Sequence, residues 1–296
     1  MNQPTEVNSN APLVTVYIPS HNRCDLLKRA VNSVLAQTYK NIELIIVDDA
    51  SVDETHHYLT QLTSEYDNVR TFKQKQAMGA CAARNIAIAD AKGTLITGLD
   101  DDDEYLPQRI EDLVAHYDEN YAFVCTGFLW HYGKKSRAVD HTAKIITLDE
   151  QLNYNYATNQ VLVATERLRA INGFDESFVA CQDYDTWTRL IKKFGNAKRV
   201  AGASYVIHRG DDIVRLTEPT NWLNGHRQFV DKHGDEMSAA NQVNQEFRRI
   251  IAKRQRLTFR ALFQQLKAGL AKQKLRYFLS SNFSFLGNIR RYFLEK

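Results

Sequence analysis

Four consecutive aspartates, Asp100 to Asp103, directly follow the apolar run 93–99. Like charges held side by side repel each other, so the cluster lowers stability unless water or a cation neutralises it. The apolar run predicts a buried strand, and ligands of open α/β sheets bind beyond the carboxyl ends of the strands. Crowded carboxylate oxygens suit Mg²⁺ or Mn²⁺, and such a metal usually also holds substrate phosphates. The alternative is a solvated acidic turn.

A second acidic pair, Asp48 and Asp49, follows the apolar run 42–47. If both strands belong to a doubly wound sheet, both acidic groups lie on the same edge. One carboxylate there commonly hydrogen-bonds a nucleotide's base or ribose, and another can hold a metal that bridges a diphosphate. The pattern favours a nucleotide-diphosphate ligand. The sequence contains neither GxxxxGK[ST] nor a GxGxxG after the first strand, which argues against a kinase, an NTPase and a dinucleotide oxidoreductase.

The elements that must position these groups alternate in type along the first half of the chain. Apolar runs predict strands and amphipathic spacing predicts helices between them. This alternation predicts an α/β fold with a mostly parallel central sheet flanked by helices. We expect strands at 13–18, 42–47, 69–72 and 93–99, and helices at 24–37, 53–62, 79–91 and 108–117, the last with Pro107 at its first turn.

The second half is predicted to add three further strands, one helix, a late strand and a helical C-terminal region. The strands are expected at 121–126, 145–148, 161–164 and 204–208, the helix at 183–194, and the helical region from 220 onward, with breaks near 234, 269 and 280–282.

Length and composition agree with a soluble globular protein. The chain of 296 residues has room for one large α/β domain with an appendage, or for two domains. Its four cysteines are far apart, which argues against a zinc site or a disulfide framework and suits a reducing cytoplasm. We expect a disordered leader at 1–12, without the features of a secretory signal, and no apolar run is long enough to span a bilayer.

Four segments, in this order and spacing, resemble the motifs of glycosyltransferase family 2. They are residues 14–23 (VTVYIPSHNR), 45–55 (IIVDDASVDET), 79–85 (GACAARN) and 99–107 (LDDDDEYLP). The resemblance covers residues 13–215. It implies a GT-A fold at 13–218, with a nucleotide-binding half at 13–126 and an acceptor half at 127–218. It also implies an inverting transfer of a sugar from a nucleotide donor.

The resemblance implies a role for each matching residue at the donor. Pro19 and Asp49 match positions that contact the nucleotide base, and Asp48 adjoins them. Arg84 is placed to meet the donor's phosphate or sugar, unless it forms only an ion pair on a helix surface.

The aspartate run matches the metal-binding motif of the family. Asp100 lies nearer the ribose and Asp102 is the better metal ligand, while Asp101 fills the slot between them and is grouped with the donor-binding residues. His208 resembles a family position where histidine completes the site of Mn²⁺ or Mg²⁺, although a lone histidine after a strand is usually structural.

Sugar transfer also needs a base, because an acceptor hydroxyl is a poor nucleophile until a carboxylate takes its proton. Inversion requires that base on the face opposite the leaving diphosphate. Residues 173–178 (GFDESF) and 182–189 (QDYDTWTR) resemble the family's base-bearing segment, and Asp183 falls on the position of the base. Gln182 stands where glutamate is commoner. The alternatives are that Asp183 is only a favourable charge at a helix start, or that Asp185 is the base.

The C-terminal region, 219–296, is strongly basic. From 248 to 296 there are 13 Lys and Arg against one acid, and apolar residues recur there at helical spacing. Such helices suit an anionic membrane surface, although they could instead pack on the catalytic domain. Nucleic acid has no recognisable binding module here.

The sequence thus predicts a metal-dependent glycosyltransferase of cell-surface polysaccharide synthesis that lies in the cytoplasm, either free or peripheral on the inner face of the cell membrane. Its donor is expected to be a UDP-sugar, and its acceptor a saccharide or lipid-linked saccharide. Phe128, Trp130 and Trp187 could stack on acceptor sugars or pack in the core. The alternative functions are a non-catalytic nucleotide-sugar-binding protein and a nucleotidyltransferase.

Overall fold

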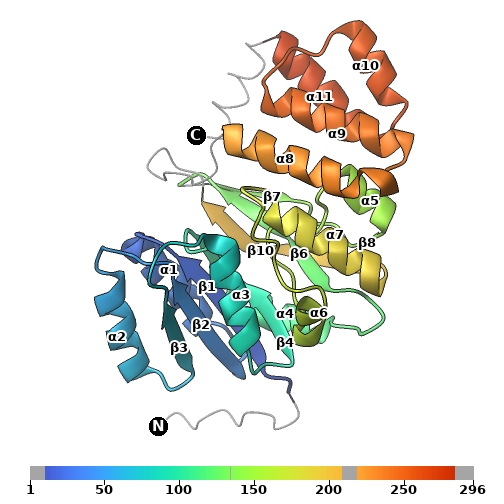
Figure 1. Ribbon diagram of the computed structural model, residues 1–296. Coiled ribbons are helices and arrows are strands. Elements are labelled where there is room, and N and C mark those ends of the chain that lie inside the picture. Colours follow the sequence, from blue (N-terminus) through green and yellow to red (C-terminus); the bar gives the residue numbers. More distant parts are fainter. Residues whose placement is uncertain (1–10, 134, 209–218, 284–296) are drawn as a thin grey trace.

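The alternating first half of the chain folds into a sheet whose strands run parallel, as the sequence predicts. The computed structural model (Figure 1) describes residues 11–133, 135–208 and 219–283. The strand order is β3-β2-β1-β4-β9, with β9 antiparallel at the edge. The strands are β1 (Val14–Ser20), β2 (Ile42–Asp48), β3 (Val69–Lys73), β4 (Leu95–Gly98) and β9 (Val163–Ala164).

Helices connect these parallel strands and cover the sheet. Every residue of β1 and of β2 is buried, as expected for central strands with both faces covered. The connecting helices are α1 (Cys24–Leu35), α2 (Thr55–Glu65) and α3 (Ala80–Asp90).

The strand register brings the predicted acidic groups to one edge. Ser20, the last residue of β1, pairs with Asp48, the last residue of β2. On the other side of β1, Tyr17 pairs with Gly98 at the end of β4, just before the aspartate run. The expectation that both acidic groups share one sheet edge is therefore confirmed.

The remaining strands form a second, mixed sheet. Strand β10 pairs parallel with β6 and antiparallel with β5 and β8, and β7 pairs antiparallel with β6. Its strands are β5 (Asp103–Tyr105), β6 (Val124–His131), β7 (Ser136–Val139), β8 (Lys144–Ile146) and β10 (Ala197–His208).

Of the four helices between residues 109 and 194, three differ from the expectation and one matches it. Helix α4 (Arg109–Ala115) begins after Gln108 rather than at Pro107, because a turn from Leu106 to Arg109 precedes it. The predicted strand 145–148 stops early because Thr147 and Glu150 form a capping box that starts α5 (Leu148–Asn153). Helix α7 (Gln182–Phe194) matches its prediction, and α6 (Thr165–Ala170) follows β9.

The C-terminal region is helical over its described part, residues 219–283, as predicted. It comprises α8 (Pro219–His233), the short 3₁₀ turn η1 (Gly234–Glu236), α9 (Ala239–Ala252), α10 (Phe259–Leu266) and α11 (Ala271–Asn282). The breaks expected near 234 and 269 are present, and the break between α9 and α10 was not predicted. Helix α8 contacts α7, and α9 contacts α5 and α8, so the region packs on the second half (Figure 1).

Three further expectations concern cysteines, membrane spans and the ends of the chain. Cys24, Cys81 and Cys125 are buried, Cys181 is half-buried, and all four are free thiols. Among the described helices, none combines the length and apolar character needed to cross a bilayer. The leader predicted at 1–12 lies almost wholly outside the described residues.

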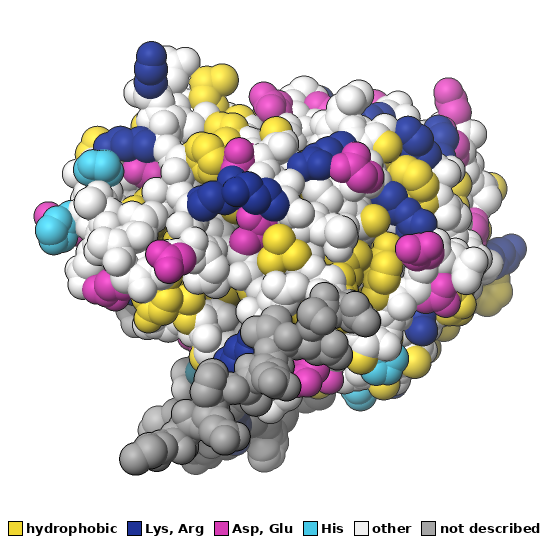
Figure 2. Space-filling model, turned by 90° about the horizontal axis from the view of Figure 1, so that it is seen from below, with side chains coloured by type: hydrophobic (Ala, Val, Ile, Leu, Met, Phe, Trp, Pro, Cys, Tyr) yellow, Lys and Arg dark blue, Asp and Glu magenta, His cyan; other side chains and the backbone are white. Residues whose placement is uncertain are grey.

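The end of the molecule opposite α9–α11 has a mixed surface. On the face shown in Figure 2, Lys and Arg side chains are interspersed with Asp and Glu. Positive charge is thus not a general property of the surface.

Candidate functional site

The loops that leave β1 and β2 are joined to each other at the carboxyl edge of the first sheet. The backbone N–H of Asn22 donates to Ser51 Oγ at 2.8 Å, and Asn22 Oδ1 accepts from the N–H of Val52 at 2.8 Å. These bonds explain why polar residues follow both strands: they satisfy backbone groups where the ladders end.

Asp48 and Asp49 both lie buried at this edge. Asp48 Oδ1 accepts from the N–H of Ser51 at 2.8 Å. Asp49 Oδ1 accepts from the N–H of Met78 at 2.7 Å, and its Oδ2 accepts from the N–H of Gly79 at 2.8 Å. Gly79 begins α3 with φ of 90°, a conformation that favours glycine. Asp49 Oδ1 also accepts from Gln74 Nε2 at 2.7 Å, whereas Oδ2 keeps a second lone pair with which Asp49 can accept a hydrogen bond from a ligand.

Asp100 connects the aspartate run to helix α3 through its side chain. Its Oδ1 accepts from Arg84 Nη2 at 2.9 Å and from Gln160 Nε2 at 3.2 Å. The Arg84 side chain is 12% exposed and lies over the Phe174 ring at 5.1 Å. Arg84 therefore forms an ion pair directed into the site rather than along the surface of its helix.

Asp101 and Asp102 converge on one cation, Arg23. Its Nη1 lies 3.2 Å from Asp101 Oδ1 and 3.1 Å from Asp102 Oδ2, and Ser20 Oγ donates to Asp101 Oδ2 at 2.8 Å. Burial raises the pKa of Asp101 to about 6 although Arg23 opposes the rise. Burial and the neighbouring Asp100 raise the pKa of Asp102.

This convergence tests whether the residues fit a divalent cation. One oxygen of Asp101 and one of Asp102 both contact the same guanidinium nitrogen of Arg23. The two carboxylates therefore form a site that binds positive charge. Mg²⁺ and Mn²⁺ bind through one or two carboxylates together with substrate phosphates, so the donor set fits them. Within the described ranges, no three His, Cys, Asp or Glu side chains gather closely enough to form a complete protein cage.

The His208 side chain is paired with Glu104 rather than with Asp101 or Asp102, and its role as a metal ligand stays a prediction. Its Nε2 lies 3.0 Å from Glu104 Oε1, and its ring contacts the ring of His131 at 5.0 Å between centroids. The pairing of β10 with β5 sets Ile207 opposite Asp103, and the His208 N–H donates to Asp103 Oδ1 at 3.4 Å, so the backbone of His208 adjoins the aspartate run while its ring lies against Glu104. Burial and the charge of Arg29 lower the pKa of His208.

Asp183 lies at the start of α7, and its carboxyl group interacts electrostatically with the Asp100–Arg84 pair. Burial raises its pKa to about 6, against the hydrogen bond from the Tyr184 N–H and the charge of Arg84, while Asp100 raises it further. Asn155 Nδ2 donates to Asp183 Oδ2 at 3.0 Å. Asp183, Arg84 and Asp100 thus form one electrostatic unit.

Asp185, the second candidate for the base, is fully buried among basic side chains. Its carboxylate lies 2.7 Å from Arg189 Nε, 2.9 Å from Lys232 Nζ and 2.9 Å from His233 Nε2. These partners outweigh burial and lower its pKa. Asp185 therefore joins α7 to α8 and is not available as a base.

Replacing Asp185 with alanine should lower the free energy of unfolding by about 3 kcal/mol. This is the lower end of the range for breaking a buried ion pair, because Arg189 and Lys232 remain partly in contact with water. Urea denaturation of the full chain measures the loss. The control Asp175→Ala removes a partly exposed partner of Lys232 and should cost about 1 kcal/mol or less. Equal losses in the two variants would contradict a joining role for Asp185.

Two amide side chains of the segment 154–160 complete the site, and the sequence did not predict them. Asn155 holds Asp183, and Gln160 holds Asp100 while accepting from the Tyr17 hydroxyl at 3.0 Å. Thr158 between them has φ of 65°, a strained value for this residue, and its carbonyl accepts from Trp187 Nε1 at 3.1 Å. Trp187 is 1% exposed, which makes it a core residue rather than an acceptor-stacking one.

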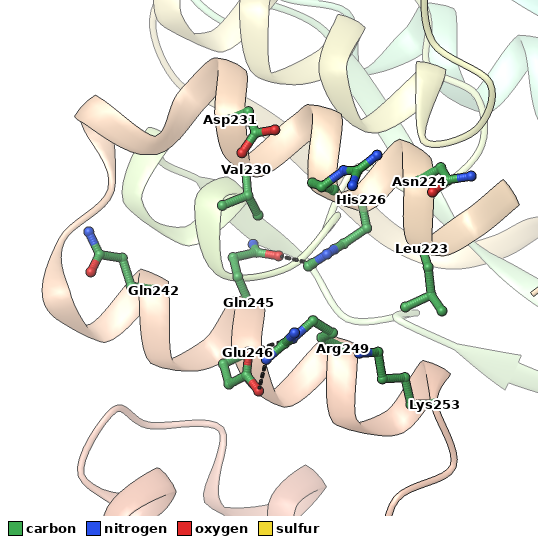
Figure 3. A pocket seen from close by; sticks show the side chains of 11 residues that line it. Leu223, Asn224, His226, Val230, Asp231, Gln242, Gln245, Glu246, Arg249 and Lys253 are labelled. Atoms are coloured by element: carbon green, nitrogen blue, oxygen red, sulfur yellow. Dashed lines mark hydrogen bonds and ion pairs between the residues drawn. The ribbon is translucent and has the colours of Figure 1, made fainter. Parts of the chain in front are cut away.

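A separate cleft of about 530 Å³ lies between α8 and α9 (Figure 3). His226 hydrogen-bonds Gln245 at 2.9 Å across it, and Glu246 pairs with Arg249 on one wall. Its charged side chains are of both signs, and it contains none of the residues that converge at the sheet edge. The chemistry is therefore assigned to the sheet edge.

Comparison with known proteins gives one matching family and several relatives. The family model described as "Glycosyl transferase family 2" matches residues 15–174. The putative colanic acid biosynthesis glycosyl transferase WcaA of Escherichia coli is 31% identical over 274 residues, covering 89% of this chain and 96% of WcaA. The UDP-Glc:alpha-D-GlcNAc-diphosphoundecaprenol beta-1,3-glucosyltransferase WfaP of E. coli is 26% identical over 204 residues, covering 67% of this chain and 78% of WfaP.

Solved structures agree on the fold. TarS of S. aureus, residues 1–349 in complex with UDP-GlcNAc, superposes with a TM-score of 0.60 and 15% identity, covering 93% of this chain and 92% of TarS 1–349. At this level of identity the likeness concerns the fold, and it confirms the predicted GT-A architecture.

Proposed function

The chain belongs to glycosyltransferase family 2, and we propose that it transfers a sugar, with inversion, from a UDP-sugar to a hydroxyl of a saccharide or lipid-linked saccharide. The observation that carries this proposal is that the segment 154–160 holds both carboxylates: Asn155 donates to Asp183, and Gln160 donates to Asp100, the ion-pair partner of Arg84. It couples a candidate base to the candidate donor-binding run at one sheet edge. A non-catalytic binding protein has no need of such a coupled base.

The choice of a uridine donor rests on similarity. The pattern around Pro19, Asp48 and Asp49 resembles uridine sites, WfaP is named for UDP-glucose, and TarS binds UDP-GlcNAc. The names of WcaA and WfaP also support a role in cell-surface polysaccharide synthesis. We infer that residues 13–126 bind the donor and 127–218 the acceptor, followed by the basic helical region 219–296.

In the proposed reaction, the acceptor hydroxyl attacks the anomeric carbon from the face opposite the diphosphate. Asp183 takes the hydroxyl proton as the new C–O bond forms and the bond to the diphosphate breaks. Asn155 orients the Asp183 carboxylate. Arg84 would pair with the negatively charged phosphates of the donor. To do so, it would give up part of its hydrogen bonding to Asp100.

Asp102 and Asp101 would hold a divalent cation with the donor's diphosphate oxygens. When bound, the cation would neutralise the negative charge of the leaving diphosphate. The cation would displace the Arg23 side chain from between the two carboxylates, and Arg23 could then pair with the negatively charged diphosphate. His208 could join the site only by leaving Glu104.

A lipid-linked acceptor would require the enzyme to work at a membrane. We propose a cytoplasmic protein held at the inner face of the cell membrane by its basic helical region. The acceptor named for WfaP, a diphosphoundecaprenol-linked sugar, supports this class of acceptor.

A screen of radiolabelled nucleotide sugars tests the function. With Mn²⁺ or Mg²⁺ present, a UDP-sugar should be transferred to a lipid-linked saccharide, or slowly hydrolysed without acceptor, and chelation should stop both. Transfer of a nucleotidyl group, detected as released pyrophosphate, would instead identify a nucleotidyltransferase. The absence of turnover with every nucleotide sugar, despite measurable binding, would identify a binding protein.

A further inference from the structure

Helices α9, α10 and α11 have a small hydrophobic core of their own. Phe247, Leu257, Leu262 and Phe278 are buried together. Lys274 is also buried, and its Nζ donates to Asn244 Oδ1 at 2.6 Å. This core accounts for only part of the apolar residues that recur along the basic C-terminal region.

Four other large apolar residues of α10 and α11 are exposed to solvent. Phe259 is 77% exposed and Phe263 is 71% exposed, one helical turn apart on α10. Leu275 and Leu279 are 45% and 47% exposed, again one turn apart on α11. The Phe259 ring lies 4.6 Å from that of Phe278, the neighbour of Leu279, so the exposed row of α10 leans on α11. We call these four residues the α10–α11 face.

The segment that carries this face has basic side chains and no acidic ones. Between 248 and 283 the sequence has ten Lys and Arg and no acid, and of these Lys274 is buried in the core. Lys267 lies 6.0 Å from the ring centre of Phe263. The opposite end of the molecule, by contrast, carries both signs of charge (Figure 2). In Figure 1 the face belongs to the helices farthest from the first sheet.

We propose that the α10–α11 face inserts into the headgroup region of an anionic lipid bilayer. Exposed aromatic and aliphatic side chains on helices with a basic surround match the chemistry of such a surface. This inference rests on the proposed function, because membrane contact would bring the enzyme to a lipid-linked acceptor. It identifies the four side chains that would make that contact.

Charge and side-chain type favour a bilayer over other occupants. A second copy of the chain would bring two basic surfaces together, and their repulsion opposes a dimer through this face. Single-stranded nucleic acid would use aromatic rings for base stacking but would gain little from Leu275 and Leu279. Hydrocarbon takes up all four side chains.

Vesicle co-sedimentation of the full chain tests the proposal. Vesicles of equal parts phosphatidylglycerol and phosphatidylcholine should bind the protein, and pure phosphatidylcholine should bind it at least about 10-fold more weakly. Phe259→Glu with Phe263→Glu should reduce binding to the anionic vesicles by at least about 10-fold, because burial of two phenylalanines is lost. The matched control Tyr66→Glu changes an exposed aromatic residue of the first half and should bind as the unmodified chain does.

Other outcomes separate this inference from the proposed function. Hydrolysis of the donor in solution should be the same in the double variant and the unmodified chain. Unchanged vesicle binding by the double variant overturns the inference and leaves the function standing. Vesicle binding without turnover of any nucleotide sugar supports the face and overturns the function. A dimer that the double variant dissociates, or binding to RNA in preference to vesicles, would assign the face to another partner.

Discussion

Replacing Asp183 with asparagine should lower kcat by about 10²- to 10⁴-fold, the usual contribution of a general base. Asparagine keeps the shape of the side chain and can still bond Asn155, but it cannot accept the acceptor's proton. Donor affinity should remain, because the residues proposed to bind the nucleotide lie on other elements. Steady-state transfer rates and calorimetric titration with UDP measure the two effects separately.

The pH profile offers a second readout of the same assignment. Burial holds the pKa of Asp183 at about 6, and the base works only when deprotonated. Activity should therefore rise with pH through about 6 and fall as pH decreases below it. Asp175→Asn, on the segment before α7, should leave both the rate and the acid limb unchanged. Full activity of Asp183→Asn would end the assignment, and Asp185 could not replace it because Arg189, Lys232 and His233 already hold its carboxylate.

The parallel sheet and its acidic edge could be predicted because each strand is an apolar run that stops at polar residues. Strand β2 illustrates this: its burial on both faces appears as a continuous apolar stretch that ends at Asp48. Once alternating helices imply parallel strands, the ends of β2 and β4 must share one edge. No detail of side-chain packing is needed for that conclusion.

The second sheet was predicted less well, because its strands depend on their partners. Strand β5 is the polar triplet Asp103–Tyr105, which has no apolar run and exists because it pairs with β10. His208, the last residue of β10, contacts Glu104 of the same triplet. The two inferred halves exchange strands here, because β5 belongs to the second sheet and β9 to the first.

The partners of the candidate residues were missed for a different reason. Asn155 and Gln160 are uncharged and lie in an irregular segment, so neither periodicity nor charge marks them. Arg23 was visible only as part of a motif, and its bridging of Asp101 and Asp102 depends on side-chain geometry. In the C-terminal region, helical spacing was evident, but which apolar residues turn inward depends on how α10 and α11 pack.

Replacing Asp102 with alanine should remove the metal dependence of donor binding. Without it, Asp101 alone would face a divalent cation, while Arg23 would keep one carboxylate partner instead of two. Loss of a direct ligand should lower the affinity for the cation by more than roughly 10- to 100-fold, which is the usual effect of losing a residue that only hydrogen-bonds to a ligand. Contacts to the uracil base of the nucleotide would persist. The variant should therefore bind UDP weakly, and Mn²⁺ should no longer strengthen that binding.

Calorimetric titration with UDP, with and without Mn²⁺, and electron paramagnetic resonance of Mn²⁺ measure this effect without relying on turnover. Asp25→Ala is a control matched in charge, because Asp25 is almost fully exposed at the start of α1. It should leave metal-dependent binding intact, which excludes a general effect of removing one negative charge. If Asp102→Ala keeps its metal dependence and Asp101→Ala loses it, the ligand is Asp101. If both variants keep it, the cation does not bind between these two carboxylates, and the convergence on Arg23 is structural.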